Sequence, residues 1–253
     1  MSLGRLVERL PFSPTITAAT AVRVLHQISR DKGSTALLLG IPCMLMVLLK
    51  LMFHDSESSF ERIGPQVFGI FPVIVMYLVA SMSTLRERTT GTAERLLTMP
   101  VRRLDIVLGY SFAFAFLALL QAVISTLLCV GPLGLDIEGP AYLLMVIAML
   151  GALLGLALGL LVSAFARNEF QAVQFLPAGV LPQFLVCGLF VPRDEMQGAL
   201  SAVAKVMPMT YAVEAAGEAA AHPGVTGVFV RDALLILVCV ILVLVASAAT
   251  LKR

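Results

Sequence analysis

The stretch AYLLMVIAMLGALLGLALGLLVSAF, residues 141–165, decides the fold class of this chain because it holds 25 residues without a single charge. A helix that crosses the ~30 Å hydrocarbon core of a bilayer needs about 20 mainly apolar residues. The stretch is therefore predicted to span a membrane. The whole chain agrees: of its 253 residues 59% are hydrophobic and 13% charged, which is about half the charge of a typical soluble domain.

Six such stretches follow one another along the chain. They cover residues 34–53, 67–85, 106–130, 141–165, 173–191 and 228–250. Pro177 and Pro182 fall inside the fifth stretch, and each removes a backbone donor, so we expect that helix to be kinked or unwound. The sequence predicts an all-α membrane protein in which residues 34–253 form a six-helix transmembrane domain.

Charge divides unequally between the predicted loops. If both termini are cytoplasmic, that side holds 13 of the 18 Lys and Arg residues and six of the 16 acidic residues, a net charge of +7. The outer side then holds five basic and ten acidic residues, a net charge of −5. Cytoplasmic loops of membrane proteins carry an excess of Lys and Arg. We therefore expect a multi-pass protein of the plasma membrane with both termini in the cytoplasm.

Residues 1–33, before the first span, are predicted to form a cytoplasmic segment with a basic amphipathic helix. At 100° per residue two opposite faces separate, Ala18, Ala21, Val22, Leu25 and Ile28 on one and Arg23, His26, Gln27 and Arg30 on the other. We expect this helix to lie at the membrane surface with its arginines among anionic headgroups. A solvated helix in a cytosolic domain is the alternative.

The predicted spans carry almost no charge. With Arg231 and Asp232 assigned to the outer side, the one charged residue in the six spans is Lys50, which is near enough to a helix end to reach water. Proton-driven carriers and intramembrane enzymes need ionisable groups near the bilayer centre, so we expect no catalytic residue. The three histidines lie in separate segments, which argues against a metal site, and the chain has no phosphate-binding GxxxxGK[ST] loop.

Small and uncharged polar residues mark three of the spans. Gly151, Gly155 and Gly159 repeat every four residues, which leaves a face for close helix packing, as a static or as a moving contact. A second set of residues lies in the second and fifth spans. We expect these residues to line a passage for an amphipathic substrate; for the polar ones, interhelical hydrogen bonds are the alternative. Its members are Phe71, Tyr77, Ser81, Gln174, Gln183 and Phe184.

Two segments between spans have patterns of their own. In the loop 86–105, an apolar ridge of Leu96, Leu97 and Met99 lies among charged residues and ends at Pro100, which predicts a short helix that docks on a partner. In the outer segment 192–227, two short apolar stretches, 198–207 and 210–221, are separated by Pro208. We expect a hairpin of two short helices that dips into the outer leaflet beside the fifth span.

The same two segments carry a family resemblance. The string LRERTTGTAERLLTMPVRR, residues 85–103, resembles the coupling loop of ABC-2 type permeases. The strings GLFVPRDEM, residues 188–196, and MPMTYAVE, residues 207–214, resemble the outer segment that follows the fifth helix in that family. The resemblance covers nearly the whole chain and is greatest to the daunorubicin-type drug exporters of actinobacteria. It implies a bacterial protein.

The resemblance also implies partners. Two permeases, identical or related, would pair within membrane lipid, and two cytosolic ATP-binding subunits would dock on their loops and bind ATP and magnesium. This chain would then bind no cofactor and no nucleic acid and would be no enzyme itself. The residues that match the coupling motif, and so are expected to transmit force from the ATP-binding subunit, are Glu87, Arg88, Gly91, Thr92, Glu94, Leu96, Leu97 and Pro100.

The function that follows is that of the membrane subunit of an ATP-driven exporter. Its expected substrate is a hydrophobic or amphipathic drug-like or lipid-linked compound, which would pass between the paired permeases along the second and fifth spans. One alternative is export of a cell-envelope polysaccharide or glycolipid. The other, from a different class, is a membrane anchor or assembly factor that transports nothing.

Overall fold

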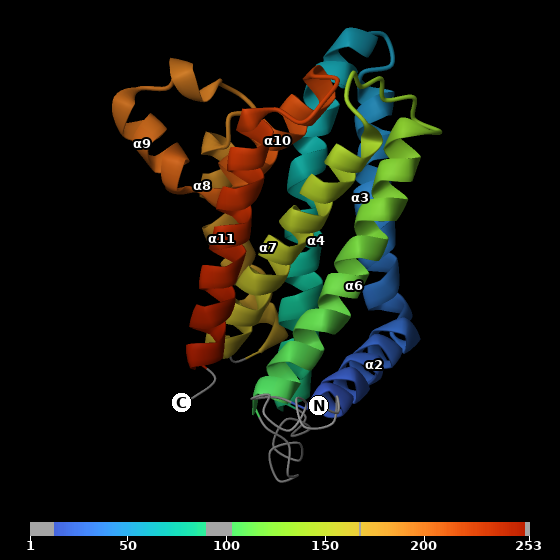
Figure 1. Cartoon of the computed structure of the whole chain (residues 1–253), viewed down its shortest axis with the longest axis vertical. Helices are drawn as coiled ribbons and strands as arrows, with labels where there is room; N and C mark the ends of the chain where they lie inside the picture. The colour runs from blue at the N-terminus through green and yellow to red at the C-terminus, as the bar shows by residue number, and fades with distance from the viewer. Residues whose placement is uncertain (1–12, 90–102, 167, 251–253) are drawn as a thin grey trace, which may run out of the picture.

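The computed structural model describes residues 13–89, 103–166 and 168–250, and this part of the chain is a bundle of helices without β-strands (Figure 1). The helices are α2 (Pro14–Arg30), α3 (Lys32–Met52), α4 (Glu57–Thr89), α6 (Arg103–Val130), α7 (Ala141–Phe165), α8 (Glu169–Val186), α9 (Gly198–Val206), α10 (Pro208–Ala221) and α11 (Gly227–Thr250). A short 3-10 turn, η1 (Arg193–Glu195), precedes α9. The all-helical fold predicted from the sequence is confirmed.

Five helices are long and apolar enough to cross a membrane, namely α3, α4, α6, α7 and α11. We call the end of the bundle with the start of α2 and the end of α11 the lower end, and the end with α10 the upper end, as drawn in Figure 1. Helix α7 has the predicted bounds. Helix α4 is much longer than the predicted span, because its amphipathic first turns continue the helix beyond the apolar stretch.

The fifth predicted span, 173–191, is not among these five helices. Helix α8 starts earlier than predicted and ends at Val186, and it runs through both Pro177 and Pro182. The chain turns shortly after α8, where Gly188 has a φ of 95°, a conformation that favours glycine. This turn explains why the helix stops before the apolar sequence does.

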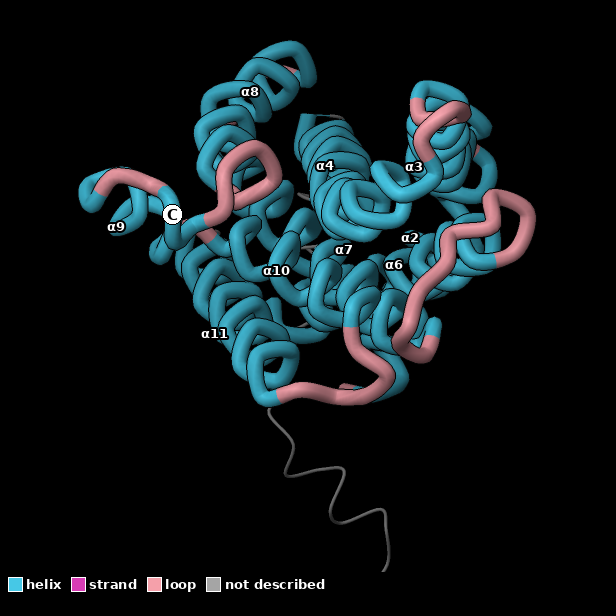
Figure 2. Tube along the Cα trace, turned by 90° about the horizontal axis from the view of Figure 1, so that it is seen from above, coloured by secondary structure: helices cyan, strands magenta, loops and turns pink. Residues whose placement is uncertain are grey.

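Helix α7 lies at the centre and contacts α4, α6, α8, α10 and α11 (Figure 2). Its three spaced glycines face the backbone of α4. A Cβ atom added to Gly155 would lie 2.1 Å from the carbonyl oxygen of Val73, and one added to Gly159 would lie 2.6 Å from that of Tyr77. Only glycine permits two helices to approach so closely. The backbones of α4 and α7 are therefore in direct contact.

The two short helices of the outer segment differ in their surroundings. Helix α9 stands apart from the rest of the bundle in Figure 1, whereas α10 packs against α4, α7 and α11. The approach of α10 to α4 is close, because a Cβ atom on Gly69 would lie 2.7 Å from the carbonyl oxygen of Ala212. Of the predicted hairpin, α10 is thus part of the helical core. Its depth in the membrane stays a prediction.

Helix α2 packs across the lower end against α6 and α3. It buries the face with Thr17, Thr20 and Val24. Thr20 can pack closely on α6 because Gly109 has no side chain there, and a Cβ atom on Gly109 would lie 2.5 Å from the Cβ of Thr20. The apolar face predicted from the sequence is therefore only partly buried, and Val22 is 65% exposed. This exposed apolar strip suits a helix that lies on a membrane surface.

Candidate functional site

Helices α4 and α8 are the two helices that the sequence assigns to a passage. On α4, most residues between Val67 and Met82 are buried, but Phe71, Ile74, Leu78 and Met82 are only half-buried. Their spacing of three and four residues places them on one side of the helix. This side forms an uncharged stripe, which we call the α4 stripe, and it is the side of α4 that other helices cover least.

Two of the predicted passage residues lie inside the subunit instead. Tyr77 is buried, and its hydroxyl donates a hydrogen bond of 3.0 Å to the carbonyl oxygen of Ala172 in α8. Ser81 is also buried and donates to the carbonyl oxygen of Leu78, 3.1 Å away. Tyr77 therefore makes an interhelical hydrogen bond, the alternative that the sequence left open, and it joins α4 to α8.

The other predicted passage residues keep some exposure. Gln174 is exposed, and Phe71 is half-buried on the α4 stripe. Gln183 is half-buried, and its side-chain amide donates to the carbonyl oxygen of Gly179 at 2.9 Å. The ring of Phe184 packs edge to face on that of Phe190, with 5.4 Å between ring centroids. These four residues remain candidates for substrate contact.

The predicted coupling residues fall partly outside the described structure. Glu87 and Arg88 belong to the last turn of α4, which extends into the predicted loop as far as Thr89. Gly91, Thr92, Glu94, Leu96, Leu97 and Pro100 lie outside the described residues. Their role in coupling stays a prediction.

Sequence reasoning missed an ion-pair cluster beside this loop. Arg86, in the last part of α4, pairs with Glu169 at the start of α8, with 3.0 Å from Nε to Oε1. It also pairs with Asp31 between α2 and α3, with 3.2 Å from Nη1 to Oδ2. All three residues belong to the predicted cytoplasmic charges, but a count of charges on each side of the membrane does not show which residues are in contact.

Asp105 is a second charged residue whose role the sequence did not reveal. It lies in the first turn of α6 and is fully buried. Its Oδ1 atom accepts hydrogen bonds from the backbone N–H of Ser13 and from the hydroxyl of Thr17, the latter at 3.4 Å. A carboxylate at the start of α2 also interacts favourably with the helix dipole. Asp105 thus anchors the N-terminal helix to α6.

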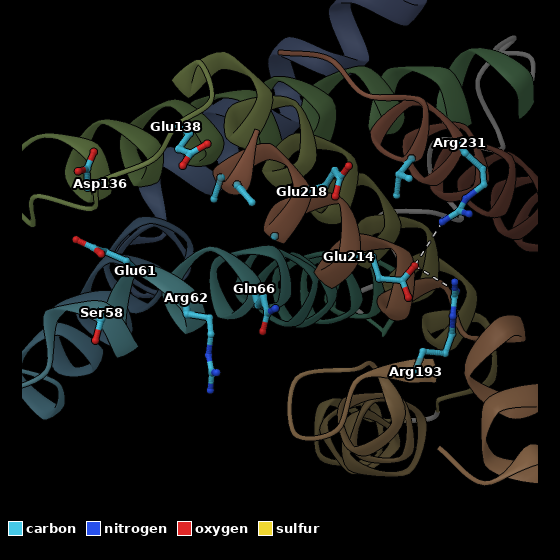
Figure 3. A pocket seen from close by; sticks show the side chains of 14 residues that line it. Ser58, Glu61, Arg62, Gln66, Asp136, Glu138, Arg193, Glu214, Glu218 and Arg231 are labelled. Atoms are coloured by element: carbon cyan, nitrogen blue, oxygen red, sulfur yellow. Dashed lines mark ion pairs between the residues drawn. The ribbon is translucent and has the colours of Figure 1, made fainter. Parts of the chain in front are cut away.

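Arg231 and Asp232, which the sequence assigns to the outer side, lie in the first turns of α11. Asp232 is fully buried, and Nε of Arg231 donates to its Oδ1 at 2.8 Å. Glu214 of α10 lies between Arg231 and Arg193, with Oε2 3.6 and 3.2 Å from the two guanidinium groups (Figure 3). Pairing with Arg231 offsets the cost of burying the Asp232 carboxylate.

Arg193, Glu214 and Arg231 border a cavity of about 830 Å³ at the upper end of the bundle. It lies between the start of α4, the α6–α7 connection, α10 and α11, and Figure 3 shows the acidic side chains of Glu61, Asp136, Glu138 and Glu218 around it. Acidic side chains outnumber arginines in the lining. The ion pairs of Glu214 connect the segment after α8 to α10 and α11, so they hold the upper end together.

Five membrane-length helices, one of which is the central glycine-lined α7, define a multi-pass membrane protein. The sequence profile of the ABC-2 type transporters matches residues 17–219, which is most of the chain. The chain belongs to the ABC-2 type transporter family. The resemblance seen in the coupling loop and the outer segment is thereby confirmed at the level of the family.

Individual relatives share between a quarter and a third of aligned residues. The Escherichia coli K12 protein named "Probable multidrug ABC transporter permease YbhS" is 29% identical over 74% of this chain and 48% of its own length. "Linearmycin resistance permease protein LnrN" of Bacillus subtilis is 28% identical over 72% of this chain and 47% of its own length. "Inner membrane transport permease YhhJ" of E. coli K12 is 28% identical over 66% and 46%. The chain thus spans about half the length of these curated relatives.

Proposed function

We propose that this chain is the membrane subunit of an ATP-driven exporter that moves a hydrophobic or amphipathic, drug-like or lipid-linked compound out of a bacterial cell. The observation that carries the proposal is the uncharged α4 stripe in a chain of the ABC-2 family. An apolar compound needs no counter-charge along its path, whereas a charged substrate in an uncharged passage would lose its hydration without compensation. The names of two relatives, which refer to multidrug transport and linearmycin resistance, support a drug-like substrate.

In the proposed transporter this chain pairs with a second permease, either a copy or a related chain. The passage lies between them, lined by the α4 stripe and by the exposed side of α8. That side includes Gln174, Leu181 and Leu185, which are spaced for one helix face. Tyr77 and Ser81 support this surface from behind and do not line it. ATP and magnesium are bound by cytosolic ATP-binding subunits, and this chain hydrolyses nothing.

Transport is tested in inside-out membrane vesicles that contain the chain and a co-expressed ATP-binding subunit of the ABC drug-exporter type. We expect ATP to drive uptake of daunorubicin, measured by quenching of its fluorescence. Vesicles with an ATP-binding subunit that lacks its phosphate-loop lysine serve as the control and should show none. Uptake of a lipid-linked sugar in place of daunorubicin would favour the envelope-glycolipid alternative. An assembled complex that moves neither would indicate an anchor.

The orientation in the membrane gives a separate prediction. The charge asymmetry predicts that Glu57, at the upper end, faces outward and that position 90 faces the cytoplasm. In a variant whose four native cysteines are alanine, we expect Glu57→Cys to react with an impermeant maleimide in intact cells. Thr90→Cys should react only after the membrane is permeabilised. Labelling of both positions from the same side would show that the assignment is wrong.

A further inference from the structure

Arg86 connects three helices where the coupling loop begins. Its Nε and Nη2 atoms donate to the two carboxylate oxygens of Glu169, at 3.0 and 3.4 Å, and its Nη1 donates to Asp31 at 3.2 Å. Glu169 is the first residue of α8, and Asp31 lies between α2 and α3. One side chain at the end of α4 is therefore bonded to the starts of two other helices.

Asp31 is fixed in place by its own hydrogen bonds, and the start of α8, which carries Glu169, is fixed by those of Asn168. Asp31 accepts from the backbone N–H groups of Gly33 and Ser34 at 3.1 and 3.3 Å, so it caps α3. The hydroxyl of Ser34 also donates to it, and these bonds hold the pKa of Asp31 below its usual value, so it is ionised at neutral pH. At the start of α8, Asn168 caps the helix by accepting from the N–H of Gln171 at 2.8 Å, next to Glu169.

Next to Arg86, the end of α4 packs on the start of α8 in a cluster that is separate from the main core. Leu85, Ala166 and Ala172 form a small buried cluster of their own, separate from the two larger clusters of the bundle. Beside it, Tyr77 donates to the carbonyl oxygen of Ala172, the second link between α4 and α8. The links between α4 and the lower part of α8 thus include the Arg86–Glu169 ion pair, the Tyr77–Ala172 hydrogen bond and the apolar cluster of Leu85 with Ala172.

Stability alone does not account for the arrangement around Arg86. Its side chain is 48% exposed and those of Glu169 and Asp31 are 42% and 36% exposed. Ion pairs at such exposure contribute about 0–1 kcal/mol to folding. A two-point contact between guanidinium and carboxylate does, however, fix the relative orientation of the two groups. The geometry suits the transmission of movement better than the stabilisation of the fold.

We propose that Arg86 is a positioning residue that transmits movement of the coupling loop to α8 and to the α2–α3 corner. The inference rests on the proposed function, because it assumes that an ATP-binding subunit moves the loop. When the loop moves, Arg86 pulls on Glu169 and Asp31 together. Helices α4 and α8, the two sides of the proposed passage, then move in step, and so does the N-terminal helix.

The test reverses charges in the purified complex, reconstituted in liposomes, and measures daunorubicin moved per ATP hydrolysed. Arg86→Glu should lower this ratio about tenfold, as expected for the loss of a typical coupling energy between two sites. The double variant Arg86→Glu with Glu169→Arg should recover part of it, because the exchanged charges can pair again between α4 and α8. Arg62→Glu, the same change near the other end of α4, is the matched control and should keep the ratio. Size-exclusion elution checks that every complex assembles.

Two results would overturn the inference, namely an unchanged ratio in assembled Arg86→Glu and no recovery in the assembled double variant.

A second readout does not depend on transport. Leu181 of α8 is 55% exposed, and a cysteine placed there should change its maleimide labelling rate when ATP and vanadate trap the complex. Arg86→Glu should abolish that change. If the parent complex moves no daunorubicin, the proposed exporter function fails, but the labelling experiment still tests the role of Arg86. A change in labelling rate that persists in Arg86→Glu, or that is absent from the parent complex, contradicts this role.

Discussion

Replacing Gly155 by alanine is expected to destabilise the bundle by ~1–3 kcal/mol or more, the range for overpacking a close contact. The new methyl group would lie 2.1 Å from the carbonyl oxygen of Val73 and 3.0 Å from the backbone nitrogen of Tyr77. Backbone atoms cannot rotate away as a flexible side chain can, so α7 and α4 must separate. The measurement is the thermal unfolding midpoint of the detergent-purified chain, followed by size-exclusion chromatography after heating.

The three glycines of α7 provide a graded series for this experiment. A Cβ atom would meet backbone at 2.6 Å on Gly159 and at 3.3 Å on Gly151, so alanine should cost less at 159 than at 155, and least at 151. Gly40 in α3 has nothing within 4 Å and serves as the matched control. There alanine should stabilise by up to ~1 kcal/mol because it lowers the entropy cost of forming the helix. Equal midpoints for Gly155→Ala and Gly40→Ala would contradict the packing.

Replacing Leu96 and Leu97 together by aspartate is expected to abolish the binding of the ATP-binding subunit and, with it, transport. An apolar anchor at the centre of an interface typically contributes ~2 kcal/mol or more, which is about 30-fold in affinity, and two charges in an apolar groove add a desolvation cost. Co-purification of the two subunits and daunorubicin uptake in vesicles are the measurements.

The control for this pair is Thr98→Asp, which adds a negative charge to the same loop and leaves the apolar ridge intact. We expect it to keep most of the binding, because in the proposed contact the ridge docks on the partner and the net charge of the loop does not. Normal co-purification and undiminished efflux by the Leu96→Asp, Leu97→Asp variant would show that the ridge is not the docking element.

The helices could be predicted where hydrophobicity is a local signal. Residues 141–165 are apolar from end to end, and α7 has those bounds. Helix α4 could not be bounded in this way, because its first ten residues include Glu57, Glu61 and Arg62 and form a helix outside the apolar run. The end of α8 depends on one backbone turn at Gly188, which leaves no mark in hydropathy.

The candidate site was less predictable, because its contacts join residues far apart in the sequence. Arg86 and Glu169 are separated by 83 residues and Ser13 and Asp105 by 92. Counting charges gives each side chain a side of the membrane but no neighbour. Tyr77 illustrates the same limit, since a polar residue at membrane depth suits both a passage and a helix contact, and only its bond to Ala172 distinguishes them.

The contact between Gly155 and Val73 has a geometric consequence for the longest helix. Helix α4 contains 33 residues, so it is ~50 Å long and exceeds the ~30 Å thickness of a hydrocarbon core. Val73 stands midway between its ends at Glu57 and Thr89. The contact can therefore act as a pivot, with helical segments of equal length on either side. A tilt of α4 by about 5° about this point would move each end by ~2 Å in opposite directions.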